Sequence, residues 1–123
     1  MATTKELIEK VNQIFKENKM EEFIQILSDD IVWDMHSSST RHSTLRGKDE
    51  ISNMDPGENM PARMDFEFGT IIIEGNSACV ECTCTGEAPN GKPYHGTSCD
   101  IYHFSNDKIS RITSYVIDNV KPV

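Results

Sequence analysis

The sequence predicts an α+β fold in which helices come first and a long antiparallel β-meander follows. Two patterns indicate this class. Apolar residues recur at helical spacing within the first 27 residues, whereas from Met64 onward apolar and polar residues alternate as they do in half-buried strands. Turn signals such as Gly75-Asn76 then separate successive strands. We therefore expect helices that cover one face of a curved sheet.

Length and charge narrow the functional classes. At 123 residues the chain can bury its own core, and we expect one domain over residues 1–123. Asp and Glu number 20 against 12 Lys and Arg, which gives a formal net charge of −8, and no basic cluster occurs. We therefore expect neither nucleic acid nor a membrane as a partner. The N-terminal stretch MATTKELIEK has no apolar run, so we expect no signal peptide and a cytoplasmic location.

The N-terminal segment predicts two helices. Thr3 and Glu6 have the spacing of a capping box, and the first helix is expected to end near Glu17. Its apolar stripe consists of Leu7, Ile8, Val11, Ile14 and Phe15. A shorter helix begins at Met20 and is expected to run into residues 28–30. Its apolar positions are Met20, Phe23, Ile24 and Leu27.

The next segment predicts a short strand, a loop and a third helix. The strand covers residues 31–36, and strand alternation places Trp33 and Met35 on one face, with Val32, Asp34 and His36 on the other. The polar run SSSTRHSTLRG is expected to form a surface loop. Gly47 then opens a brief helix that Pro56 must end, because the residue before a proline avoids helical geometry.

The second half of the chain predicts the sheet. One strand begins near Met64, passes a bulge at Gly69 and ends before the Gly75-Asn76 turn. SACVECTCT forms the next strand, and GEAPNGKP forms a loop. Residues 94–118 form a long closing hairpin with its turn at residues 105–107.

Asp100 lies in the middle of the first strand of this hairpin. Asp is unfavourable in strands, and a carboxylate on a covered face needs partners or a function. Two interpretations are open: a solvated acid on the outer surface, or an acid that faces a pocket. In the second, the pKa of Asp100 rises, because apolar and aromatic side chains surround it and its strand contains no Lys or Arg. A raised pKa indicates a functional site.

The four cysteines are candidate zinc ligands, but their predicted positions do not converge on one point. Cys82 and Cys84 share one strand face, while alternation puts Cys79 on the other, and Cys99 comes later in the chain. We therefore expect all four to be reduced, as small hydrophobic residues, with no metal.

The element order, the motif SDDIVW, a glycine that opens a short helix, and the closing stretch CDIYHFSNDKISRITSYVID together resemble the SnoaL-like branch of the nuclear transport factor 2-like superfamily, over the whole chain. The resemblance implies a cone: a strongly bent antiparallel sheet wrapped around the N-terminal helices, with a deep apolar pocket at the open end. It also implies a homodimer formed through the sheet. The superfamily includes ketosteroid isomerases, polyketide cyclases, epoxide hydrolases and proteins without catalysis, so the residues of the site must decide function.

The resemblance to ketosteroid isomerase carries over at one of three positions. Asp100, four residues before Phe104, matches the oxyanion-hole Asp. Val11 occupies the tyrosine position, and Met35 occupies the position of the base. A one-residue shift of register would bring Asp34 or His36 there instead, and the sequence leaves these alternatives open.

Other members of the superfamily match to different degrees. The Asp-Arg-Asp arrangement of limonene-type epoxide hydrolases is missing. The central strand VECTC has neither the Arg nor the Asp, and the position expected for the acid of the last strand falls near Ser114. SnoaL-type polyketide cyclases are the most similar, since they place an acid on the penultimate strand beside aromatic residues and His.

Two functions from different classes follow from this comparison. The first is a cofactor-free isomerase or polyketide cyclase for a small hydrophobic carbonyl compound, with Asp100 and His36 as its catalytic residues. The second is a non-catalytic dimeric module that binds a small hydrophobic molecule. In both, we expect the pocket to be lined by Trp33, Met35, Phe15, Phe68, Tyr102 and Ile112.

Overall fold

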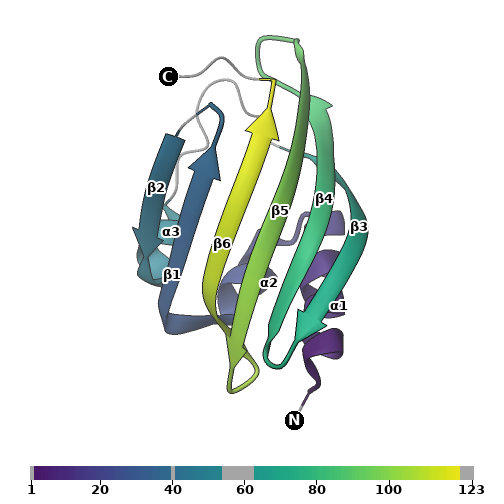
Figure 1. The fold of residues 1–123 in the computed structure, drawn as a ribbon. Coiled ribbons are helices and arrows are strands. Elements are labelled where there is room, and N and C mark those ends of the chain that lie inside the picture. The colour runs from purple at the N-terminus through teal and green to yellow at the C-terminus, as the bar shows by residue number, and fades with distance from the viewer. Residues whose placement is uncertain (1, 40, 54–62, 120–123) are drawn as a thin grey trace.

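The computed structural model describes residues 2–39, 41–53 and 63–119. Three helices lie on one side of a single curved sheet (Figure 1). The helices are α1 (Thr4–Lys16), α2 (Met20–Gln25) and α3 (Gly47–Ser52). The strands are β1 (Leu27–Ser37), β2 (Arg41–Arg46), β3 (Asp65–Glu74), β4 (Ser77–Glu87), β5 (Pro93–Ser105) and β6 (Lys108–Asp118). The α+β class and the bent sheet of a cone are thus confirmed.

The sheet has the strand order β2-β1-β6-β5-β4-β3. Its neighbouring strands are antiparallel, except that β1 and β6 are parallel. The expected antiparallel sheet is thus confirmed, and this one pair is its parallel exception. A parallel pair needs a long connection, and the chain between β1 and β6 supplies one, since it contains all the other strands.

Two boundaries near β1 differ from those predicted. The polar run after residue 36 is not only a loop, because residues 41–46 form edge strand β2, in which Leu45 pairs with Trp33. The second helix ends at Gln25, and β1 begins at Leu27, which pairs with Ile109 of β6. Pairing across the sheet therefore overrides local polarity and local helical periodicity.

Several local predictions are confirmed. The capping box joins Thr3 and Glu6 at the start of α1. Gly75 turns the β3–β4 hairpin with φ +56°, a left-handed conformation that glycine adopts without steric strain. The β3–β4 register shifts between Phe68 and Ile71, which places the bulge at Gly69. The predicted helix end at Pro56 lies outside the described residues.

The core lies between the helices and the face of the sheet that they cover, which we call the concave face; the opposite face is the outer face. In Figure 1, α1 and α2 lie behind the lower half of the sheet, near the two hairpin turns. The most deeply buried side chains there are Phe23, Ile8, Leu27, Ile31, Ile109, Ile112, Val11 and Val80. The upper part of the concave face, beside the other ends of β4, β5 and β6, is covered by neither α1 nor α2.

Candidate functional site

Strand alternation on β5 decides where Asp100 points. Tyr102 and Phe104, two and four residues further along, are buried in the core, so Asp100 shares the concave face with them. His95 and His103, which are an odd number of residues from Asp100 along β5, lie on the outer face. Asp100 is partly buried and its Cα pairs with those of Val80 and Ser114 on the two flanking strands. The outward-facing interpretation of Asp100 was therefore wrong.

A chain of hydrogen bonds on the concave face ends at the Asp100 carboxylate. Ser98 Oγ donates to Asp100 Oδ2 at 2.8 Å. On the other side, the Ser114 hydroxyl is hydrogen-bonded to the Asp100 side chain, and Trp33 Nε1 donates to Ser114 Oγ at 2.9 Å. Because the indole can only donate, Ser114 accepts from Trp33 and directs its own proton to Asp100. We call this arrangement the Trp33–Ser114–Asp100 chain.

The electrostatic surroundings of Asp100 favour its neutral form. Burial raises the pKa of Asp100 above its ordinary value, and the hydrogen bonds from Ser114 and Ser98 oppose this rise only in part. In the described part of the chain, Asp100 forms no salt bridge with Lys, Arg or His. The predicted direction of the pKa shift thus agrees with the environment of the residue.

The neighbouring side chains on the concave face are held neutral as well. Burial, followed by the charge of Asp100, raises the pKa of Tyr102 well above its ordinary value. Burial raises the pKa of the Cys82 thiol to about 12. Burial is also the main reason that the pKa of Tyr94, near the upper end of β5, is raised. A charge on Asp100 would therefore have hydroxyl and thiol neighbours but no compensating cation among them.

The structure separates the predicted lining residues into two groups. Trp33 and Met35 pair with Ile112 and Ser114 on β6, so they lie on the concave face next to the Trp33–Ser114–Asp100 chain. This register settles the position that the sequence left open among Asp34, Met35 and His36. Of the other lining residues, Tyr102 and Ile112 lie in the buried core, whereas Phe15 and Phe68, like Trp33, are partly buried and pack against it. Among these, Phe15 packs against Phe23 with the ring centroids 4.9 Å apart and the ring planes tilted by 49°.

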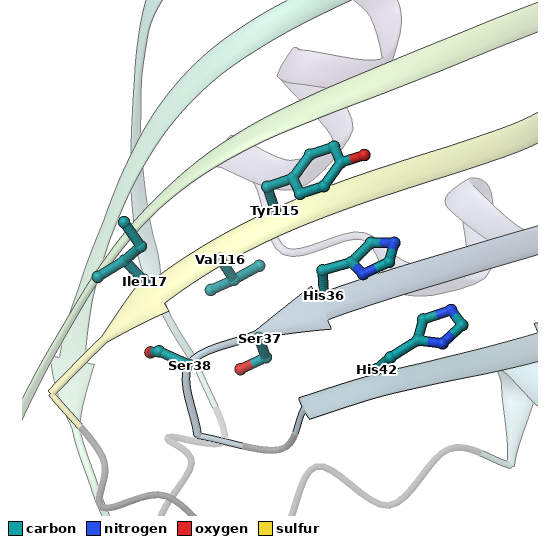
Figure 2. A pocket seen from close by; sticks show the side chains of 7 residues that line it. All are labelled: His36, Ser37, Ser38, His42, Tyr115, Val116 and Ile117. Atoms are coloured by element: carbon teal, nitrogen blue, oxygen red, sulfur yellow. The ribbon is translucent and has the colours of Figure 1, made fainter.

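The structure does not bring His36 and Asp100 together. His36 is on the outer face, because it alternates with Trp33 and Met35 along β1. Its ring stacks between those of His42 and Tyr115, with centroid separations of 4.5 and 4.9 Å. Figure 2 shows these three rings side by side on three strands. The expectation that His36 acts beside Asp100 was therefore wrong, because one strand face cannot carry both Trp33 and His36.

The outer face has an open hollow beside this stack. The hollow has a volume of about 470 Å³ and is lined by His36, Ser37, Ser38, His42, Tyr115, Val116 and Ile117 (Figure 2). Tyr115 and Ile117 are 50 % and 73 % exposed, which is a large apolar exposure for neighbouring positions of one strand.

Asp34, the second acid considered for the site, is also on the outer face. Thr44 Oγ1 donates to its carboxylate at 2.7 Å, and Arg111 forms an ion pair with it. These contacts, the Thr44 hydrogen bond first, lower the pKa of Asp34. Asp34 is thus a paired surface carboxylate.

Sequence reasoning missed Ser98 and Ser114 as functional residues. Ser98 carried a usable signal, since it lies two residues before Asp100 and so shares its strand face. Ser114 had no such signal, because its position depends on the register of β6 against both β5 and β1.

The cysteines occupy the faces that alternation predicted. Cys82 is buried on the concave face, and Cys79 is on the outer face. All four are free thiols. Within the described ranges, no group of three or more His, Cys, Asp or Glu is placed to hold a metal ion. None of the described helices has the length and apolar character needed to cross a membrane.

The comparisons with known proteins agree with this architecture. The family model of the SnoaL-like domain matches residues 8–112. A nuclear transport factor 2-like protein of unknown function from Cytophaga hutchinsonii has 24 % identity and a TM-score of 0.70, with 94 % of this chain and 100 % of that chain covered. No curated protein sequence matches this chain.

Two further solved structures have named activities. A protein from Jannaschia, provisionally named a SnoaL-like polyketide cyclase, has 12 % identity and a TM-score of 0.73, with coverages of 89 % and 84 %. An epoxide hydrolase from M. tuberculosis, described as LEH-like, has 14 % identity and a TM-score of 0.69, with coverages of 90 % and 80 %. These likenesses show a shared fold. Because the family model covers most of the chain and the geometry agrees with it, this protein belongs to the SnoaL-like domain family.

Proposed function

We propose that this protein is a cofactor-free isomerase or cyclase for a small hydrophobic carbonyl compound, with Asp100 as its acid–base residue. One observation carries the proposal: two serine hydroxyls, one of which accepts a hydrogen bond from the Trp33 indole, hold a carboxyl group on the concave face. Among the described residues no cation pairs with this group, and its pKa is raised. Such a group exchanges protons more readily at neutral pH than an ordinary carboxyl does. We also propose that residues 1–123 act as one domain.

The proposed chemistry is proton transfer next to a carbonyl. The Asp100 carboxylate accepts the proton that the carbon next to the carbonyl loses, an enolate forms, and protonated Asp100 then returns a proton to the enolate. Ser98 and Ser114 act as positioning residues, because their hydrogen bonds fix the carboxyl group on the strand. Neither serine needs to contact the substrate.

The surroundings of Asp100 favour a small apolar substrate. Met35 pairs with Ser114, which in turn pairs with Asp100, so an apolar side chain lies two strands from the carboxyl group on the same face. On the other side, the charge of Asp100 adds to the raised pKa of the Cys82 thiol, which is neutral. An anionic substrate would meet no cation among these neighbours, whereas a neutral carbonyl compound meets a hydrogen-bond donor.

Deuterium exchange tests the proposal with a panel of candidate substrates. The protein is incubated with a set of small hydrophobic ketones in deuterium oxide, and exchange at the carbon next to the carbonyl is followed by NMR. We expect catalysed exchange with some members of the set. Asp100→Asn should lower the rate about 10²–10⁴-fold, the usual contribution of an acid–base residue.

Asp34→Asn is the matched control, because it removes an acid from the opposite face of the same sheet. It should leave the exchange rate unchanged. Equal exchange rates for the wild type and Asp100→Asn would show that Asp100 is not the acid–base residue.

A second candidate function is a dimeric module that binds a small hydrophobic molecule without transforming it. The observation that favours it is Met35, which lies beside Ser114 where related isomerases place a base. In this case, ketones should shift the NMR signals of residues around Asp100, and no deuterium should enter the ligand. The exchange experiment thus separates the two functions.

We further propose a homodimer that forms through the outer face. The exposed side chains of Tyr115, Ile117 and Ile72 lie on strands of this face, and burying them would remove apolar surface from water. Light scattering at micromolar concentration should give twice the chain mass. Ile117→Lys should give the monomer mass, whereas Ser52→Lys, which adds the same charge at an exposed position of α3 on the helix side of the sheet, should keep the dimer mass.

A further inference from the structure

Two of the four thiols meet on the outer face. The Sγ atoms of Cys79 on β4 and Cys99 on β5 lie 3.1 Å apart. Both side chains are partly buried, so neither is sealed in the core. The alternation that separates Cys79 from Cys82 and Cys84 is what leaves it facing Cys99.

The register shows how this contact arises. Cys79 pairs with Ile101, and Cys99 pairs with Glu81, so the two cysteines are diagonal neighbours on adjacent strands. Diagonal positions are farther apart than directly opposite ones, and short side chains rarely meet across them. Here both side chains turn toward each other, which brings the sulfurs into contact.

We propose that Cys79 and Cys99 form a redox-active dithiol, which two-electron oxidants of the peroxide class convert reversibly into an intramolecular disulfide. A disulfide has sulfurs about 2.05 Å apart, so the two atoms must approach by about 1 Å from their present separation. This site is independent of the proposed catalysis, because it uses neither Ser98 nor Asp100, but it shares the outer face with the proposed dimer interface.

The protonation of the pair assigns a role to each thiol. The hydrogen bond with Cys79, followed by burial, raises the pKa of Cys99 to about 11. Cys99 therefore keeps its proton, so we assign the first reaction with the oxidant to Cys79. Nearby carboxylates of Asp100 and Glu81 add to the rise.

The reaction with hydrogen peroxide balances in two steps. The Cys79 thiolate attacks one peroxide oxygen, the O–O bond breaks, and a sulfenic acid and hydroxide form. Cys99 sulfur then attacks Cys79 sulfur, the S–O bond breaks, and the second oxygen leaves as water after taking up a proton. In total, two thiols lose two protons and two electrons, and one peroxide becomes two water molecules.

The other two cysteines serve as internal controls. Cys82 and Cys84 share the concave face, and burial raises the pKa of both thiols. Cys82 is buried and Cys84 is partly buried, and thiols that stay protonated react slowly with oxidants. Oxidation of the folded protein should therefore select Cys79 and Cys99 over Cys82 and Cys84.

Disulfide mapping tests the proposal on the wild-type protein. Reduced folded protein is treated with hydrogen peroxide, free thiols are alkylated, and the chain is cleaved after glutamate. Cys79 then lies in residues 75–81, Cys82 and Cys84 lie in residues 82–87, and Cys99 lies in residues 88–123. We expect residues 75–81 to be linked to residues 88–123, at a mass about 2 Da below the sum of the two reduced peptides. Dithiothreitol should restore both.

Variants and protein concentration complete the test. Cys79→Ser should abolish the link, and Cys82→Ser should leave its yield unchanged. Because the proposed dimer uses the same face, the oxidation is run from dilute to concentrated protein. A link that involves mainly residues 82–87, or no link at any concentration, would overturn the proposal. The wild-type map separates these outcomes even where a variant does not fold.

Discussion

Asp34 and Asp100 are both mid-strand acids of the same sheet, yet their surroundings shift their pKa values in opposite directions. Asp34 on the outer face receives a hydrogen bond from Thr44 and an ion pair from Arg111, and its pKa is lowered. Among the described residues, Asp100 on the concave face has hydroxyl donors and no cation, and burial raises its pKa. The surroundings of Asp34 stabilise its charged form, whereas those of Asp100 destabilise its charged form.

This difference identifies the face that is suited to chemistry. A charged group that is fully compensated contributes to stability and resists a change of protonation state. A carboxyl group that lacks a cation retains a tendency to bind a proton, and proton transfer requires such a group. The comparison therefore favours Asp100 over Asp34 as the acid–base residue, although both are acids in strands.

Removing Ser114 should produce the largest loss of stability. Ser114→Ala deletes the acceptor of Trp33 Nε1 and one donor to Asp100, so a buried donor and a buried carboxyl group each lose a partner. Leaving one such group unpaired costs about 1–3 kcal/mol. We expect the free energy of unfolding, measured with urea, to fall by about that amount. Ser110→Ala is the control, because Ser110 donates only to the His103 carbonyl at 3.1 Å. An equal loss in both variants would contradict the chain of hydrogen bonds.

Asp100→Asn should stabilise the protein at neutral to alkaline pH. A carboxyl group with a raised pKa in the folded state contributes stability that is fully present below its unfolded pKa and is lost as pH rises through the folded pKa. The amide stays neutral, so the variant avoids this loss. We expect a gain of about 0.5–2 kcal/mol at pH 8, as for other stabilising substitutions. The gain should vanish below the ordinary carboxyl value of 3.8. A loss of stability at pH 8 would instead indicate that Asp100 is well compensated as an anion.

Ser98→Ala should move the titration of Asp100 without a large loss of stability. The hydrogen bond from Ser98 lowers the pKa of Asp100, so its removal should raise that pKa further. Trp33 is the single tryptophan and is joined to Asp100 through Ser114, so its fluorescence reports this titration. We expect the midpoint to shift to higher pH in Ser98→Ala. The transition should be lost in Asp100→Asn and retained in Asp34→Asn.

The sequence predicted those parts of the fold that depend on local pattern. Alternation along residues 31–36 placed Trp33 and Asp34 on opposite faces, and a turn at Gly75 divided β3 from β4, as the structure has them. Local pattern failed for residues 41–46, which are polar because edge strand β2 has hydrogen bonds on one side and water on the other. Alternation and turn chemistry act over a few residues, and so a single sequence displays them.

The candidate site was predictable only in part, because its partners come from distant strands. Asp100 was identified from its unfavourable position in a strand. Its link to Trp33 depends on Ser114, which is 81 residues away from Trp33 in the sequence. That contact needs the parallel pairing of β1 with β6, which no local pattern encodes. For the same reason, the sequence analysis placed His36 next to Asp100. Only the observed register shows that Met35, and not His36, lies on the concave face.

Asp34→Asn should give the smallest effect, and its pH dependence should be opposite in sign to that of Asp100→Asn. The pKa of Asp34 is lowered, first by the Thr44 hydrogen bond and then by the charge of Arg111. A lowered folded pKa contributes stability that is present above the unfolded value of 3.8 and is lost as pH falls through the folded pKa. The variant should therefore be slightly less stable than the wild type at pH 7.

The difference between Asp34→Asn and the wild type should shrink as the pH falls below 3.8, when both side chains are neutral. It should also shrink at pH 7 in high salt, because surface ion pairs such as Asp34–Arg111 are screened. Urea denaturation at several pH values measures both trends. A stabilising effect of Asp34→Asn at pH 7 would mean that the two acids are alike, and the electrostatic argument for choosing Asp100 would then fail.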